Sequence, residues 1–245
     1  MRRTWLLATT WLTGGLSKRN RGVGKLGRAN GGRPIRMRQL DQANPWTILH
    51  REEKFTCSYF SVRSDTVQFR AGLPRTYNSI RMNSIGVTIA PIDDEGCTTL
   101  VGQYRYVLDR FTWELPAGGC RLDQAPVEAA KIELSEETGY RAANWLRLFD
   151  CAVSPGSIDG RTQCFVAWGL QPGAPHPEPE EQLVQRRMPF AESISMALSG
   201  EISHFASVSL LLGIQTKLTR GELPPKLAKL SNSTSSFQST ISLVS

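Results

Sequence analysis

The chain has 245 residues, enough for one good-sized domain with tails or for two small domains, and its formal net charge is +7. Ten of its 29 Lys/Arg residues lie in residues 1–40, which contain no Asp or Glu, so the remainder has 19 basic against 22 acidic residues. This distribution excludes a nucleic-acid-binding role that rests on a basic domain. No apolar run has the length needed to span a bilayer.

The basic leader, residues 1–40, has three interpretations. Arg2 and Arg3 before residues 5–12 resemble a weak secretory signal, and the Arg-rich, acid-free composition also fits an organelle transit peptide. The third interpretation, which we favour, is that translation begins at Met37. In all three the leader stays outside the fold, because its Gly/Arg-rich middle has too little apolar surface to order itself.

The cysteines indicate a reducing compartment. There are five, an odd number, and none are spaced as a Cys-x-x-Cys pair: Cys57, Cys97, Cys120, Cys151 and Cys164. Neither a zinc site nor a disulfide framework follows from this spacing. The expected location is the cytoplasm, or an organelle if the leader directs the chain there.

The first half of the chain predicts strands. An N-terminal strand segment, residues 41–83, contains predicted strands at 46–49, 59–62 and 66–69, with Gly72-Leu73-Pro74 as a turn. Next come strands at 85–92 and 98–106 around a hairpin turn at 93–96, then a strand at 111–115, a Gly118-Gly119 turn and a helix over 126–138. Pro126 suits the first helical turn and Gly139 suits the C-terminal cap.

The second half mixes strands and helices. Strands are predicted at 145–153 and 162–170 around a loop at 154–161, followed by a proline-rich acidic loop at 171–181. Helices are predicted at 189–198 and 202–218, and a Ser/Thr-rich tail, 219–245, is expected to be frayed or disordered. This order predicts one α+β domain with a mixed sheet between helices.

Three carboxylates on the 126–138 helix point to a metal. Glu133, Glu136 and Glu137 stand at i, i+3 and i+4, which puts them on one helical face. Like charges at this spacing weaken a helix, so a sequence that keeps them usually has a cation to neutralise them. Oxygen ligands favour a hard cation such as Mg²⁺ or Mn²⁺.

These residues resemble the Nudix hydrolase box, G-x5-E-x7-R-E-U-x-E-E-x-G-U, where U is a bulky apolar residue. The positions in register are Gly118, Glu133, Leu134, Glu136, Glu137, Gly139 and Tyr140. Two positions depart, because Gln124 stands at the first glutamate and Ile132 at the arginine. The runs 114–119, 102–106 and 154–156 are similar to the ADP-ribose or ADP-sugar pyrophosphatase branch, and the resemblance covers roughly residues 44–216.

The resemblance implies a Nudix-type α/β/α sandwich over residues 84–218, preceded by an N-terminal antiparallel strand segment that crosses to a partner subunit in a homodimer. It implies metal binding by Glu133, Glu137, the Ala117 carbonyl and Glu181. It implies catalytic roles for Glu136, Glu137 and Glu181. Glu178 and Glu180 are the alternatives to Glu181 as the residue that activates water.

The substrate-binding residues implied by the resemblance lie on other segments. Arg105 matches the position that contacts the substrate diphosphate, and a guanidinium suits this role because it donates a planar pair of hydrogen bonds. Glu114 either binds a second metal or orients Arg105. Ser154 and Arg161 lie in the loop expected near the terminal sugar, while His50, His176 and His204 are isolated and receive no catalytic role.

The expected activity is metal-dependent hydrolysis of a nucleoside diphosphate sugar, with ADP-ribose as the leading substrate and AMP and a sugar phosphate as products. The alternative is a degenerate Nudix domain that binds a nucleotide-sugar or a protein without hydrolysing it. Gln124 and Ile132 replace both partners of an ion pair at once, which spares the fold an unpaired charge but loosens the carboxylates. We expect Gln124 to hydrogen-bond the loop and Ile132 only to pack.

Overall fold

The computed structural model describes residues 43–176 and 182–232. The chain divides into two units, residues 1–44 and 45–245, and all of the helices and strands described here lie in the second. The leader and Glu178, Glu180 and Glu181 lie outside the described residues. No helix in the described part combines the length and the apolar character needed to cross a membrane.

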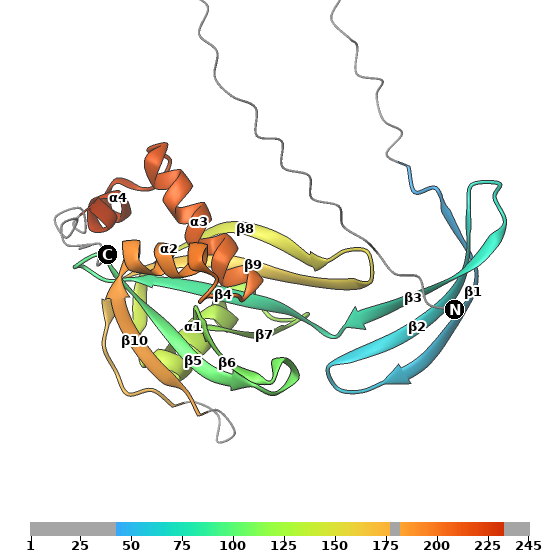
Figure 1. The fold of residues 1–245 in the computed structure, drawn as a ribbon, viewed down its shortest axis with the longest axis horizontal. Helices are drawn as coiled ribbons and strands as arrows, with labels where there is room; N and C mark the ends of the chain where they lie inside the picture. The colour runs from blue at the N-terminus through green and yellow to red at the C-terminus, as the bar shows by residue number, and fades with distance from the viewer. Residues whose placement is uncertain (1–42, 177–181, 233–245) are drawn as a thin grey trace, which may run out of the picture. The chain divides into compact units, whose positions relative to one another are not determined.

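The N-terminal strand segment is an antiparallel meander of three strands, β1 (Trp46–Thr56), β2 (Phe60–Phe69) and β3 (Pro74–Met82). The last of them meets β9 (Ile158–Gln171) in a single parallel bridge, Ile80 to Ile158. In Figure 1, β3 passes the tip of the hairpin that β9 forms with β8 (Arg141–Ser154). The sequence predicted two strands where β2 runs unbroken. The polar residues between them are accommodated because Arg51 of β1 donates to both carboxylate oxygens of Asp65, at 3.0 and 2.8 Å.

The central sheet is mixed, as predicted. Its strands are β4 (Ser84–Ile92), β5 (Cys97–Arg105), β6 (Arg110–Glu114), β7 (Ala117–Arg121), β8 (Arg141–Ser154), β9 and β10 (Val184–Pro189). Strands β4 and β9 run parallel from Gly86–Thr162 to Ile92–Trp168, whereas β4–β7, β5–β6, β5–β10 and β8–β9 are antiparallel. A short 3-10 helix, Tyr106–Leu108, connects β5 to β6.

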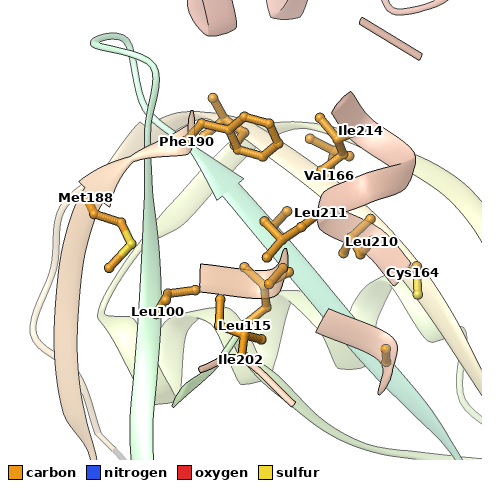
Figure 2. Packing of buried hydrophobic residues seen from close by; sticks show 14 of the residues in the cluster. Leu100, Leu115, Cys164, Val166, Met188, Phe190, Ile202, Leu210, Leu211 and Ile214 are labelled. Atoms are coloured by element: carbon orange, nitrogen blue, oxygen red, sulfur yellow. The ribbon is translucent and has the colours of Figure 1, made fainter. Parts of the chain in front are cut away.

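Helices cover both faces of this sheet because successive strand residues point to opposite sides. Helix α1 (Pro126–Thr138) packs on one face, in a core with Val87 and Ile89 of β4 and Phe165 of β9. Helices α2 (Phe190–Ser199), α3 (Phe205–Thr219) and α4 (Pro225–Asn232) belong to the other core. Figure 2 shows this second core, where Leu210, Leu211 and Ile214 of α3 meet Val166 of β9. The α/β/α sandwich is confirmed.

Three elements differ from the sequence predictions. Gly118 and Gly119, predicted as a turn, are inside β7 and pair with Val87 and Gly86 of β4. Strand β10 was not predicted as a full strand. Helix α4 lies in the stretch expected to be frayed, and it is held there because Leu227 is buried in the α2–α3 core.

Candidate active site

Two glutamates of α1 face strand β7. The helix begins with Pro126 and ends at Gly139, whose φ of 75° is the left-handed conformation that a C-cap glycine adopts. Glu137 is buried, and the Ala117 N–H donates to its Oε2 at 3.0 Å. The Glu133 carboxylate lies against the Cα of Gly118, so closely that a Cβ at residue 118 would overlap it. The box glycine is therefore required by the position of the Glu133 carboxylate.

Glu136 lies on a different flank of α1. Together with Ile132, Arg141 and Trp145 it lines a cavity of about 500 Å³ between α1 and β8. Ile132, which stands at the box arginine and was expected only to pack, is 48% exposed. No group of three or more His, Cys, Asp or Glu side chains suited to hold a metal occurs among residues 43–176 and 182–232.

The C-terminal end of α1 contacts the first half of the proline-rich acidic loop and strand β10. The carbonyl of Glu136 accepts from the His176 N–H at 2.9 Å, and the carbonyl of Glu137 accepts from Gln185 Nε2 of β10 at 2.8 Å. Gly139 and Gly173 approach so closely that a Cβ on residue 139 would overlap the Gly173 carbonyl. Sequence reasoning missed Gln185 and Gly173, because a contact between distant backbone segments leaves no local pattern.

A cavity of about 460 Å³ lies beside β7. Its lining brings together three residues predicted for the site, Arg105, Ala117 and Arg161, although they come from β5, β7 and β9. Gly118 and Gly119 line the same cavity, as do His204, Phe205 and Ala206 at the start of α3. The glutamates of α1 thus contact a strand whose residues also line this cavity.

Arg105 and Glu114 form a bidentate ion pair. Arg105 Nε donates to Glu114 Oε1 at 2.9 Å and Nη2 donates to Oε2 at 2.7 Å, while Thr112 Oγ1 also donates to Oε1 at 2.7 Å. Burial by itself raises the pKa of Glu114, but the hydrogen bonds from Arg105 and Thr112 outweigh it and hold the pKa below its usual value. The geometry agrees with the alternative in which Glu114 orients Arg105.

Behind this pair lie His204, the N-cap residue of α3, and Ser207 of α3. His204 was expected to be isolated, and its contacts correct that expectation, while Ser207 was not singled out by sequence reasoning. His204 Nδ1 is 3.5 Å from Glu114 Oε2 and 2.9 Å from Ser207 Oγ, and Ser207 Oγ also accepts from the Leu115 N–H at 2.9 Å. Burial lowers the pKa of His204, and the nearby Arg105 lowers it further against the opposing charge of Glu114. A second cavity, of about 560 Å³, is lined by Arg105, Glu114 and His204.

Ser154 and Arg161 hold the β8–β9 hairpin. Ser154 Oγ is 3.2 Å from Ser157 Oγ within the turn, and Ser154 is not among the residues that line the cavity beside β7. Arg161 lines that cavity but also pairs with Asp150 of β8 at 2.6 Å. Asp159 in the same hairpin contacts β3, since it accepts from the Met82 N–H at 2.8 Å and pairs with Arg81 at 3.0 Å.

The donor set at β7 suits a hard cation. Its carboxylates, Glu133 and Glu137, and the carbonyl of Ala117 offer only oxygen atoms, which Mg²⁺ and Mn²⁺ prefer. The bare Cα of Gly118 leaves room for the Glu133 carboxylate against β7, as a shared site requires. The described residues therefore fit a divalent cation, with Glu181 lying outside them.

Comparisons with known proteins agree with this geometry. The chain matches the NUDIX domain family over residues 82–207. It is similar to an ADP-ribose pyrophosphatase of Mycobacterium tuberculosis, with 33% identity over 180 residues, covering 71% of this chain and 85% of the relative. It is also similar to the ADP compounds hydrolase NudE of Escherichia coli, with 27% identity over 166 residues, covering 67% and 89%.

A solved structure shares the fold. A crystal structure of an ADP compounds hydrolase superposes with a TM-score of 0.67 at 25% identity, and the match covers 75% of this chain and 100% of that one. The family match over the central domain agrees with the resemblance of the box around Gly118 and Glu137. The chain therefore belongs to the Nudix hydrolase family.

Proposed function

We propose that the protein hydrolyses the diphosphate bond of a nucleoside diphosphate sugar, with ADP-ribose as the leading substrate and AMP and a sugar phosphate as products. The observation that carries this proposal is the meeting of Glu133 and Glu137 with Ala117 and Gly118 on a strand that borders the Arg105 cavity. The relatives named for ADP-ribose and ADP compounds support the choice of substrate class.

The cofactor is a divalent cation, as is general for Nudix enzymes, and we propose Mg²⁺ with Mn²⁺ as a substitute. Glu133, Glu137, the Ala117 carbonyl and Glu181 would hold it. When bound, such a cation neutralises phosphoryl oxygens and lowers the pKa of a coordinated water. The oxygen-only donor set is the support for this choice.

The chain's own residues supply the remaining chemistry. Arg105, held in one orientation by Glu114, donates hydrogen bonds to the oxygens of the diphosphate. Glu181 takes the proton of the attacking water. Glu136 and Glu137 are the other two catalytic carboxylates. Arg161 and Ser154 bind the sugar end of the substrate. Water attacks one phosphorus of the diphosphate, and the bond from that phosphorus to the bridging oxygen breaks.

We also propose that the protein acts as a homodimer in the cytoplasm. The dimer is supported by large apolar side chains of the N-terminal strand segment that are half exposed, such as Ile48, Leu49 and Phe55. The cytoplasm is supported by the five cysteines, which are all free. Light scattering on the protein as it elutes from a size-exclusion column tests the dimer. A mass equal to that of one chain at micromolar concentration would refute the proposed dimer.

The second candidate is a degenerate Nudix domain that binds a nucleotide-sugar or a protein without cleaving it. The observations that favour it are the half-exposed Ile132 in place of the box arginine and the lack of a three-carboxylate cluster among the residues described. The two candidates differ in turnover, not in affinity.

The experiment is a measurement of AMP release from ADP-ribose and other nucleotide-sugars, at millimolar Mg²⁺ or Mn²⁺ and again with a chelator. Metal-dependent release of AMP is the expected result. Binding of ADP-ribose without release of AMP, by folded protein in the presence of metal, would replace the proposed hydrolase with the binding domain.

A further inference from the structure

His204 lies where two cavities meet. It lines the cavity beside β7 and the second cavity next to the β5–β6 connection, and Arg105 is also in both linings. His204 occupies the N-cap position of α3, yet its side chain makes no capping hydrogen bond to the helix. Its imidazole therefore does not cap the helix, and it lines both cavities together with Arg105, whose guanidinium is proposed to hold the diphosphate.

Ser207 selects the tautomer of this imidazole. Ser207 is fully buried, and its Oγ accepts from the Leu115 N–H at 2.9 Å. Its other partner is His204 Nδ1 at 2.9 Å, which is the one that can accept the single hydroxyl proton. With Nδ1 acting as an acceptor, a neutral ring carries its proton on Nε2. The opposite tautomer would direct two donors at Ser207 Oγ and leave the buried hydroxyl proton without either partner as an acceptor.

Burial lowers the pKa of His204 below its ordinary value of 6.5, which favours the neutral ring. Glu114 does not take the ring proton. Its Oε2 is 3.5 Å from Nδ1, beyond a good hydrogen bond, and both of its oxygens already accept from Arg105. The Nε2–H is left as a donor for another group.

We propose that His204 is a further substrate-binding residue, whose Nε2–H donates a hydrogen bond to an oxygen of the diphosphate held by Arg105. The proposal rests on the proposed function, since it concerns the same substrate. A neutral donor suits this position because the charge of Arg105 is already balanced by Glu114, so the imidazole adds direction without adding charge. Its backing by Ser207 and Leu115 fixes the ring before the substrate arrives.

The test compares His204→Leu, which removes the donor, with His204→Gln, which keeps a neutral donor. His50→Leu is the matched control, because it makes the same substitution at an exposed residue of β1. Each protein is assayed for AMP release from ADP-ribose with Mg²⁺, giving KM and kcat, and for ADP-ribose binding by calorimetry in a chelator. Thermal melting checks that each variant is folded.

We expect His204→Leu to raise both KM and the Kd for ADP-ribose by ~10-fold, the effect of one lost hydrogen bond, and to change kcat much less. His204→Gln should recover most of the affinity, and His50→Leu should match the wild type. Equal Kd values for His204→Leu and the wild type would overturn the proposal.

The two proposals fail separately. If the wild type releases AMP but His204→Leu binds ADP-ribose as well as the wild type does, the role of His204 is refuted and the hydrolase stands. If the wild type binds without turnover and His204→Leu binds ~10-fold more weakly, the role of His204 stands and hydrolysis is refuted.

Discussion

At Gly118 the space that a Cβ would fill is taken by the carboxylate of Glu133. The next residue offers a matched contrast, because a Cβ at Gly119 meets no atom within 4 Å. Both glycines lie in β7 and neither has a positive φ, so an alanine at either position avoids left-handed strain. Alanine at Gly118 and alanine at Gly119 therefore distinguish an effect on the Glu133 carboxylate from a general effect of a side chain on strand β7.

We predict that Gly118→Ala lowers kcat for AMP release by ~10²-fold, because it displaces the Glu133 carboxylate by about 1 Å. Gly119→Ala should keep activity within about 3-fold of the wild type, since its Cβ points into open space. Steady-state assays with thermal melts measure both effects. Equal losses in the two variants would show that β7 is merely intolerant of side chains.

The Arg105–Glu114 pair makes a prediction about pH. The folded-state pKa of Glu114 lies below the ordinary value of 4.5, so the pair's contribution to stability is fully present above pH 4.5 and is lost as pH falls through the folded pKa. Glu114→Gln should therefore melt below the wild type at pH 7, and the difference in Tm should shrink below pH 4.5. Melting curves from pH 3 to 8 measure this, and a constant difference would contradict it.

The sequence could predict those site residues whose spacing is local, but not those brought together by contacts between distant segments. Glu133 and Glu137 could be proposed from the sequence because their register with Gly118 and Gly139 is local. Glu136 shares that register but turns toward Ile132 and Trp145, because a spacing of three does not fix which flank of a helix meets which neighbour. His204 and Ser207 reach Glu114 and Leu115 from about 90 positions away, and nothing in the local pattern marks such a contact.

At the scale of elements, the sequence predicted helix α1 from the residues at its two ends, but it did not predict strand β7. Pro126 and Gly139 mark the helix limits through backbone effects that act within a few residues. Gly118 and Gly119 suggest a turn by their own preferences, but the ladder with β4 holds them as a strand. The ladder joins residues about 30 positions apart, so local propensity gives the wrong answer there.

The contact between Gly139 at the end of α1 and Gly173 in the acidic loop makes a prediction about stability. Gly139 and Gly200 are both C-cap glycines with positive φ, but a Cβ on Gly200 meets open space whereas one on Gly139 overlaps the Gly173 carbonyl. Gly200→Ala should cost about 1–2 kcal/mol for the left-handed conformation alone. Gly139→Ala should cost a further ~1–3 kcal/mol for overpacking. Chemical denaturation measures both, and equal costs would contradict the contact.

At the scale of the whole molecule, the described fold begins with β1 and ends with α4. The helices and strands of the described residues lie between Trp46 and Asn232, and the Leu227 side chain is buried in the α2–α3 core. We therefore predict that a protein starting at Met37 melts within about 2 °C of the full chain, since a change below 0.5 kcal/mol shifts Tm by roughly that much.

Two C-terminal truncations test where the folded domain ends. A protein of residues 37–232 should keep the stability of the full chain, whereas one of residues 37–224 should lose about 2 kcal/mol or more because Leu227 is removed from the core. Thermal or urea unfolding measures the loss. If both shortened proteins melted together, α4 would not be part of the folded domain.

The central claim is that Glu133 and Glu137 still form a working hydrolytic site, although Gln124 and Ile132 replace two residues of the box. The most direct measurement is the rate of AMP release from ADP-ribose with Mg²⁺ by the wild type and by Glu137→Gln, which keeps the shape of the buried side chain. The account predicts metal-dependent turnover by the wild type and a loss of ~10²-fold or more in the variant, since the cation contributes several kcal/mol to the transition state. Equal rates in the two proteins would contradict it.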